Sequence, residues 1–167
     1  APDGRSLASA GLDRTVRIWD VASGKELRTL RGHEGRVTAV AWSSDGTLLA
    51  SSSSDRTVRI WNTASGAARS TLRHSERVYN VAFSPRGTEL ASGAVDGLVR
   101  IWDVATASER WVTAGHTGIV TAVRFGPDGR SLFSVGLDQR ARRWDPSVAT
   151  PATTARGHTG AVNGIAF

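Results

Sequence analysis

Short apolar runs rich in β-branched residues alternate with turn-forming residues along the whole chain. Residues 37–42 (VTAVAW) predict a buried strand, and the following Ser44, Asp45 and Gly46 predict a turn, because Asp bonds its own backbone and Gly accepts a positive φ. Further strands are predicted at residues 48–53, 57–61 and 68–72, with turns at 55–56 and 64–66. No helical period is present, so the local pattern predicts a unit of four short strands.

Four residue types recur along the chain in one register. The recurring positions are Trp19, Trp61, Trp102 and Trp144; His33, His74, His116 and His158; Asp13, Asp55, Asp96 and Asp138; and Ser9, Ser51, Ser92 and Ser134. Successive members of each set lie 41 or 42 residues apart. Four short strands in a repeat of about 40–45 residues are typical of one β-propeller blade. We therefore expect an all-β fold, a β-propeller of four-stranded antiparallel blades with four blades per chain.

Two dipeptide motifs mark the repeat. They are Gly-His, at Gly32-His33, Gly115-His116 and Gly157-His158, and Trp-Asp, at Trp19-Asp20, Trp102-Asp103 and Trp144-Asp145. In these motifs the entire chain resembles the WD-repeat family of β-propellers. The departures are Asn62 after Trp61, the missing glycine before His74, Arg143 in the place of Ile18, Ile60 and Ile101, and Pro146 and Pro151 in the last outer strand.

The repeat also predicts how the chain divides into blades. Residues 32–73, 74–114 and 115–156 should form blades 2, 3 and 4. Residues 1–31 should supply strands two to four of blade 1, and residues 157–167 its first strand, in cis or in trans. Phe167 followed by Ala1 would reproduce the sequence around Phe125, and an open edge would invite association.

A Ser, a His and an Asp in each repeat raise the question of a hydrolase. Four equivalent sets and the absence of a Gly-x-Ser-x-Gly motif argue against catalysis. The resemblance implies instead a buried hydrogen-bond network from Trp through Ser and His to Asp, in which every member is satisfied. The complete sets are His33, Ser51, Asp55 and Trp61; His74, Ser92, Asp96 and Trp102; and His116, Ser134, Asp138 and Trp144. Ser9, Asp13 and Trp19 lack a preceding histidine, and His158 lacks the other three.

The composition of the chain excludes several kinds of site. The chain of 167 residues has no cysteine, so disulfides and cysteine-ligated zinc are excluded. We predict no cofactor and no metal site, because the four histidines belong to separate blades. No apolar run is long enough for a membrane span, and the N-terminus does not resemble a signal peptide. A cytoplasmic location is expected, and the Arg-over-Lys and Ala-rich usage would suit a bacterial genome.

The formal charge of +6 could indicate a nucleic-acid partner. The arginines are spread over every repeat, as at Arg17, Arg59, Arg100 and Arg142, without a dense basic run. We therefore interpret them as a solvated, arginine-biased surface and consider nucleic-acid binding the less favoured alternative.

Ring size depends on how the ends meet. A closed ring of four blades would need about 90° per blade and a ring of eight about 45°, within the range of roughly four to eight blades that propellers span. The bulky inter-blade packing that the resemblance implies suits the larger ring. We expect a homodimer that closes an eight-bladed ring, in which His158 meets Ser9, Asp13 and Trp19 of the other chain.

The resemblance implies a flat top face that presents loops to peptides and proteins. The candidate binding residues are Leu12, Arg36, Ser54, Arg77, Val95, Ile119, Leu137 and Ala161. Apolar side chains with a cationic rim suit a peptide partner, although scattered surface aliphatics also occur without one. We predict a non-catalytic protein-interaction scaffold; the alternatives are a self-assembling propeller fragment without a ligand, excised or engineered, and a nucleic-acid binder.

Overall fold

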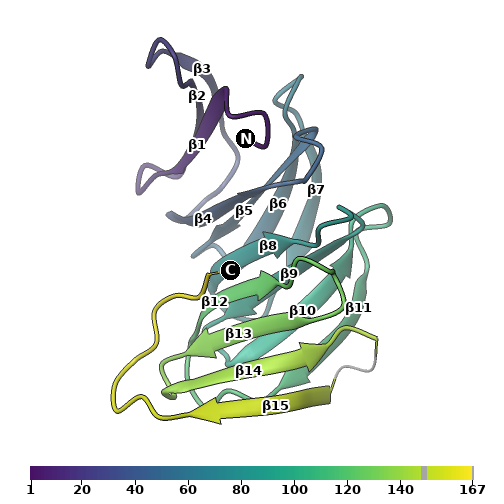
Figure 1. The fold of residues 1–167 in the computed structure, drawn as a ribbon. Coiled ribbons are helices and arrows are strands. Elements are labelled where there is room, and N and C mark those ends of the chain that lie inside the picture. Colours follow the sequence, from purple (N-terminus) through teal and green to yellow (C-terminus); the bar gives the residue numbers. More distant parts are fainter. Residues whose placement is uncertain (148–149, 167) are drawn as a thin grey trace.

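The chain folds into four consecutive antiparallel sheets, one for each repeat (Figure 1). The computed structural model describes residues 1–147 and 150–166, with the backbone alone for residues 150–152. Three of the sheets have four strands and the first has three. The predicted all-β fold with antiparallel blades is thereby confirmed. Within the described residues, no helix has the length and apolar character needed to cross a membrane.

Each blade is a meander of neighbouring strands. Blade 1 contains β1 (Ser6–Ala10), β2 (Val16–Asp20) and β3 (Glu26–Leu30). Blade 2 contains β4 (Val37–Trp42), β5 (Leu48–Ser53), β6 (Thr57–Asn62) and β7 (Ala68–Arg73). Blade 3 contains β8 (Val78–Phe83), β9 (Glu89–Ala94), β10 (Leu98–Asp103) and β11 (Glu109–Ala114). Blade 4 contains β12 (Val120–Phe125), β13 (Leu132–Gly136), β14 (Arg140–Asp145) and β15 (Thr150–Arg156).

The tight turn after the second strand of each blade is set by its aspartate. In blade 2 the backbone N–H of Thr57 donates to Asp55 Oδ1 at 2.9 Å, and the intervening Arg56 has a φ of 68°. Such a left-handed residue is what an Asp-centred turn of this kind accommodates. The aspartate is therefore held at the same place in every blade.

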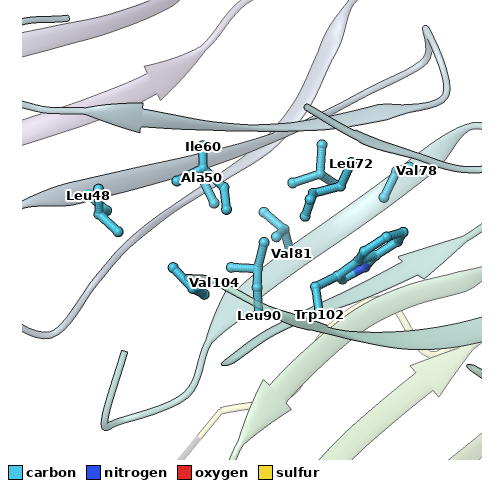
Figure 2. Close-up of a cluster of buried hydrophobic side chains, with 10 residues drawn as sticks. Leu48, Ala50, Ile60, Leu72, Val78, Val81, Leu90, Trp102 and Val104 are labelled. Atoms are coloured by element: carbon cyan, nitrogen blue, oxygen red, sulfur yellow. The ribbon is translucent and has the colours of Figure 1, made fainter. Parts of the chain in front are cut away.

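Apolar side chains fill the space between neighbouring blades. Ile60 and Leu72 of blade 2 pack against Leu90 and Trp102 of blade 3 (Figure 2). Equivalent clusters join blades 1 and 2 and blades 3 and 4. Each blade thus has a leading face, with its Leu, Ser and Trp toward the preceding blade, and a trailing face toward the following one. Burial of each such side chain contributes about 1.5–3 kcal/mol.

The outermost strand of blade 4 contains Pro151. β15 runs from Thr150 to Arg156 and pairs only with β14 among the described strands. The strand shows a shift in register opposite Trp144, but the other three blades have the same shift opposite Trp19, Trp61 and Trp102, so the expected interruption by proline is not seen in the pairing. An edge strand tolerates proline because one side of its backbone needs no hydrogen-bond partner.

The four blades form an open arc rather than a closed ring (Figure 1). Blade 1 has no innermost strand, and no hydrogen bond joins residues 157–166 to it. The first strand of blade 1 that was predicted within residues 157–167 is not formed over residues 157–166, and Phe167 lies outside the described residues. The physical reason is that a strand needs a partner edge, and in a single chain the edge of β1 stays remote.

Candidate functional site

The recurring Ser, His, Asp and Trp meet between the strands of one blade. In blade 2, Ser51 lies on β5, Trp61 on β6, Asp55 in the turn between them, and His33 in the loop before β4. Ser51 and Trp61 belong to the leading face, where the side chains are shielded by blade 1. All of Ser51 and nearly all of Trp61 are buried.

Hydrogen bonds join these four side chains in series. Trp61 Nε1 donates to Ser51 Oγ at 2.8 Å, and His33 Nε2 lies 2.7 Å from the same oxygen. His33 Nδ1 lies 2.7 Å from Asp55 Oδ2. The indole can only donate and the carboxylate can only accept. The serine proton therefore points to His33 Nε2, and the histidine is neutral with its proton on Nδ1.

The electrostatics of blade 2 agree with this assignment. Burial lowers the pKa of His33, although the Asp55 carboxylate opposes that shift. Burial raises the pKa of Asp55, but hydrogen bonds from Thr57 and His33 outweigh it and bring the pKa below its usual value. A neutral imidazole beside an ionised carboxylate is the stable combination near neutral pH.

Blade 4 repeats the same geometry. Trp144 Nε1 donates to Ser134 Oγ at 2.7 Å, His116 Nε2 lies 2.7 Å from that oxygen, and His116 Nδ1 lies 2.8 Å from Asp138 Oδ1. The structure therefore brings together all four residues of this predicted set.

Blade 3 lacks one link that the sequence predicts. His74 Nε2 lies 2.8 Å from Ser92 Oγ, which also accepts from Trp102 Nε1 at 2.9 Å. His74 Nδ1, however, lies 3.4 Å from the Leu72 carbonyl oxygen, and no bond to Asp96 forms. The predicted link from His74 to Asp96 is thus wrong. The loop before β8 is one residue shorter because it lacks the glycine, so the imidazole is turned away from the carboxylate.

An arginine takes the place of the histidine on Asp96. Arg100 Nη2 donates to Asp96 Oδ2 at 2.9 Å, and the Ser75 hydroxyl donates to the same oxygen at 2.9 Å. Burial, together with the nearby Arg100 charge, lowers the pKa of His74 to about 4. His74 is therefore neutral at physiological pH without a carboxylate to hold it.

Blade 1 has an incomplete set. Trp19 Nε1 donates to Ser9 Oγ at 2.8 Å, and Asp13 accepts from Arg17 at 3.0 Å. Where a histidine lies in the other blades, an open hollow of about 430 Å³ lies beside Ser9, Asp13 and Trp19. His158, which the sequence assigns to this position, is exposed at the other end of the arc.

The complete networks resemble a catalytic triad in their distances but not in access. The Ser51, Ser92 and Ser134 side chains are fully buried. Each serine oxygen accepts a hydrogen bond from an indole, which engages one of its two lone pairs, and burial closes the approach of a carbonyl carbon to the other. Nucleophilic attack needs an accessible hydroxyl beside oxyanion donors. The geometry therefore supports a structural role for these residues.

Three arginines pair with the network aspartates, which the sequence pattern alone did not reveal. Arg100 and Arg142 are buried, so the interpretation as solvated surface residues is wrong for these two, whereas the Arg17 side chain is 37% exposed. Arg142 Nη2 lies 3.7 Å from Asp138 Oδ2, and Arg17 bonds to Asp13. The available signal was their spacing, four residues after each network aspartate.

The candidate top-face residues lie in pairs at equivalent positions of successive blades. The N–H of Ser54 donates to the Arg36 carbonyl at 3.0 Å, that of Val95 to Arg77 at 2.9 Å, and that of Leu137 to Ile119 at 2.9 Å. Arg36 and Arg77 are exposed, Val95 and Ile119 half-buried, and Leu137 43% exposed. Leu12 and Ala161 have no such partner in the described chain.

Consecutive antiparallel blades, two of them held by a complete buried Trp-Ser-His-Asp network, define a protein of the β-propeller class. The family model described as "WD domain, G-beta repeat" matches residues 1–20, 24–62, 66–103 and 108–145. The chain therefore belongs to the WD-repeat family. This family model indicates no catalytic activity.

Three curated relatives are each similar to this chain over about one repeat. The chain is 51% identical to the Dictyostelium discoideum anaphase-promoting complex subunit cdc20 over 41 residues, 25% of this chain and 8% of that protein. It is 62% identical to mitochondrial division protein 1 of Mycosarcoma maydis over 32 residues, 19% of this chain and 4% of that protein. It is 49% identical to mouse coronin-7 over 39 residues, 23% of this chain and 4% of that protein. The matched segments thus span less than a tenth of these relatives.

Proposed function

We propose that the protein is a non-catalytic interaction scaffold that binds a protein or peptide on its top face. The observation that carries this proposal is the equivalent placement of the pairs Arg36–Ser54, Arg77–Val95 and Ile119–Leu137. The reactive Ser and His side chains of the complete networks are sealed inside the blades, while these pairs occupy equivalent loop positions in successive blades. Membership of the WD-repeat family and similarity to a subunit of a named complex support the same function.

The chemistry of this face favours one kind of ligand. Two exposed arginines, Arg36 on blade 2 and Arg77 on blade 3, occupy the positions that are equivalent to the apolar Ile119 of blade 4. Arginines and apolar anchors in one patch suit a peptide with acidic and aliphatic side chains. We expect the affinity to fall with added salt, because exposed ion pairs are screened.

A selection of random displayed peptides on the immobilised 167-residue chain tests this function. Enriched peptides should bind wild type and lose at least tenfold in affinity for the R36E/R77E variant. The matched control is R69E/R73E, which makes the same charge change on exposed residues of the outer strand β7. Equal loss with both variants would indicate non-specific charge attraction. Peptide binding by R36E/R77E with the affinity of wild type would place the binding site elsewhere.

For its assembly we propose a homodimer that closes an eight-bladed ring. The arc is open, and blade 1 lacks an innermost strand to pair with β1 among the described strands; such an unpaired edge favours association. Nucleic-acid binding is the less supported alternative, since two of the arginines that make up the positive charge are buried. A cytoplasmic location remains a prediction.

A further inference from the structure

We propose that the outer half of blade 2 binds a phosphate group through Arg59 on β6 and through Thr71 and Arg73 on β7. This site is separate from the candidate top-face residues and does not depend on how the chain assembles. Three observations support it: a guanidinium group without an acceptor, a hydroxyl and a second guanidinium on the same face of the blade, and the lack of a free carboxylate beside them.

Arg59 lacks the acceptor that its equivalents have in the other blades. Arg17, Arg100 and Arg142 lie 3.0, 2.9 and 3.7 Å from the aspartate four residues earlier. Within the described part of the chain, Arg59 forms no hydrogen bond and no ion pair. Its Cζ lies 5.9 Å from the centroid of the Trp61 ring, and such a contact uses the face of the guanidinium and leaves its in-plane N–H groups able to donate.

The aspartate of blade 2 is already saturated by other donors. Asp55 Oδ1 accepts from the N–H of Thr57 at 2.9 Å and from its hydroxyl at 2.6 Å. Asp55 Oδ2 accepts from the N–H of Glu34 at 2.9 Å and lies 2.7 Å from His33 Nδ1. Arg59 is therefore left as a half-buried cation with unpaired N–H groups, and an acceptor from a ligand would satisfy them.

A second carboxylate is also missing at this place. Glu26 accepts from Arg17 at 2.7 Å, and Glu109 lies 3.5 Å from Arg100 Nε. The equivalent residue of blade 2 is Ala68, and β7 contains no acidic residue. Because Ala68 is exposed and short, the place of the glutamate is open to an anion.

Two further donors share the face of Arg59. Arg59 pairs with Thr71, and Thr57 pairs with Arg73, between β6 and β7. Paired residues and alternate residues of a strand point to the same face, so Thr71 and Arg73 lie on the side of Arg59. Both are exposed, and neither side chain forms a hydrogen bond within the described residues. A Cβ atom on Gly32 would approach Arg59 Nη1 to 3.0 Å, so the glycine leaves that nitrogen uncovered.

The charge of this cluster favours a phosphate group over a single carboxylate. Arg59 and Arg73 carry two positive charges, and Thr71 adds a hydroxyl donor. A phosphate monoester carries about −1.5 to −2 charges near pH 7 and offers three acceptor oxygens. Guanidinium groups bind such oxygens in a bidentate manner. The phosphate could be free in solution or belong to a phosphorylated side chain.

Titration of the 167-residue chain with inorganic phosphate tests the site. Binding is followed by 31P NMR at pH 7.5, with the ionic strength held constant by NaCl. We expect saturable binding of one phosphate per chain. A second titration with N-acetyl-O-phosphoserine amide distinguishes the sources. Tighter binding of this compound would indicate a phosphorylated protein, and equal binding would indicate recognition of the phosphate group alone.

Four variants locate the bound phosphate. A68E introduces a carboxylate where the equivalent glutamates lie in blades 1 and 3, so it should fold normally, engage Arg59 and weaken phosphate binding at least tenfold. The neutral A68Q should bind within about threefold of wild type, a difference of under 1 kcal/mol. R73Q should weaken binding at least threefold. R86Q removes an exposed arginine from the turn between β8 and β9 and should leave the affinity unchanged.

Each of the other outcomes would overturn the proposal. Wild type without saturable binding would exclude the site, and equal weakening by R73Q and R86Q would indicate attraction by the total charge. Weakening by A68Q as strong as that by A68E would trace the loss to bulk on β7 rather than to the Arg59 charge. The displayed peptides that test the top face carry no phosphate, so failure of one test leaves the other function standing.

Discussion

Arg100 holds the carboxylate of Asp96 through a contact of 2.9 Å, in the place that histidine occupies on the equivalent carboxylates of blades 2 and 4. One missing glycine in the loop before β8 accompanies this exchange. The network of blade 3 consequently divides into two parts: Trp102, Ser92 and His74 in one, and Asp96, Arg100 and Ser75 in the other.

This division makes blade 3 a source of acid sensitivity. The pKa of His74 is about 4 in the folded chain against 6.5 for a free histidine. The unfolded chain therefore binds more protons between these values, so stability is complete above pH 6.5 and falls as the pH drops toward 4. We expect the protonation of His74 in the unfolded chain to lower the free energy of unfolding at pH 5 by about 2 kcal/mol relative to its value above pH 6.5. Urea unfolding of wild type and H74Q at pH 7.5 and pH 5 measures it.

His158 offers the matched control for this pH experiment. It is exposed in the single chain, so H158Q controls for the replacement of a histidine by glutamine outside the networks. H74Q should lose less stability on acidification than wild type. An equal loss in all three proteins would mean that His74 does not titrate as its burial requires.

The network serines should contribute far more to the free energy of unfolding than other serines in the strands. Ser51 Oγ accepts from Trp61 and contacts His33, both of which are buried. In S51A the indole N–H is left without an acceptor, at a cost of about 1–3 kcal/mol for each unsatisfied buried group. Ser70 on β7 has no hydrogen bond from its side chain in the described chain, so S70A should change the unfolding free energy by less than about 0.5 kcal/mol. Similar losses for the two variants in urea would contradict the structural role of the network.

Much of the fold could be predicted from the sequence, because strand periodicity and turn residues act locally. The strands predicted at residues 37–42 and 48–53 coincide with β4 and β5. The fate of His74 could not be predicted, since motif spacing does not show how a loop shortened by one residue turns an imidazole. The burial of Arg100 was missed for a related reason: a charged residue in a strand appears solvent-facing until its ion-pair partner is placed.

Arg59 is the network arginine without a carboxylate partner. Its equivalent Arg17 bonds Glu26 at 2.7 Å, and Arg100 lies 3.5 Å from Glu109, whereas the matching position in blade 2 is Ala68. Arg59 Nε is buried and makes no hydrogen bond. We expect A68E to raise the unfolding free energy by about 0.5–1 kcal/mol at low salt.

The neutral variant A68Q separates charge from packing. It has nearly the same length and should give a smaller gain that does not depend on salt, whereas the gain of A68E should shrink at 1 M NaCl. If A68Q stabilises as much as A68E at low salt, an ion pair with Arg59 is not the cause.

Arg143 tests the strength of the proposed seam between two chains. Ile18, Ile60 and Ile101 occupy this position on the trailing faces of blades 1, 2 and 3 and are buried against the next blade. Arg143 instead bonds Ser131 through Nε at 3.0 Å and is exposed. In the dimer it would face Leu7 and Trp19 of the other chain, where its charge must be desolvated. We therefore expect R143I to tighten dimerisation by at least tenfold, measured by sedimentation across a dilution series.

R124I removes another exposed arginine, from β12, and it should leave the dissociation constant within about threefold of wild type, a difference of under 1 kcal/mol. Weaker dimerisation of R143I would show that the trailing face of blade 4 does not meet the leading face of blade 1, because an isoleucine at this position is favourable at every such contact inside the chain.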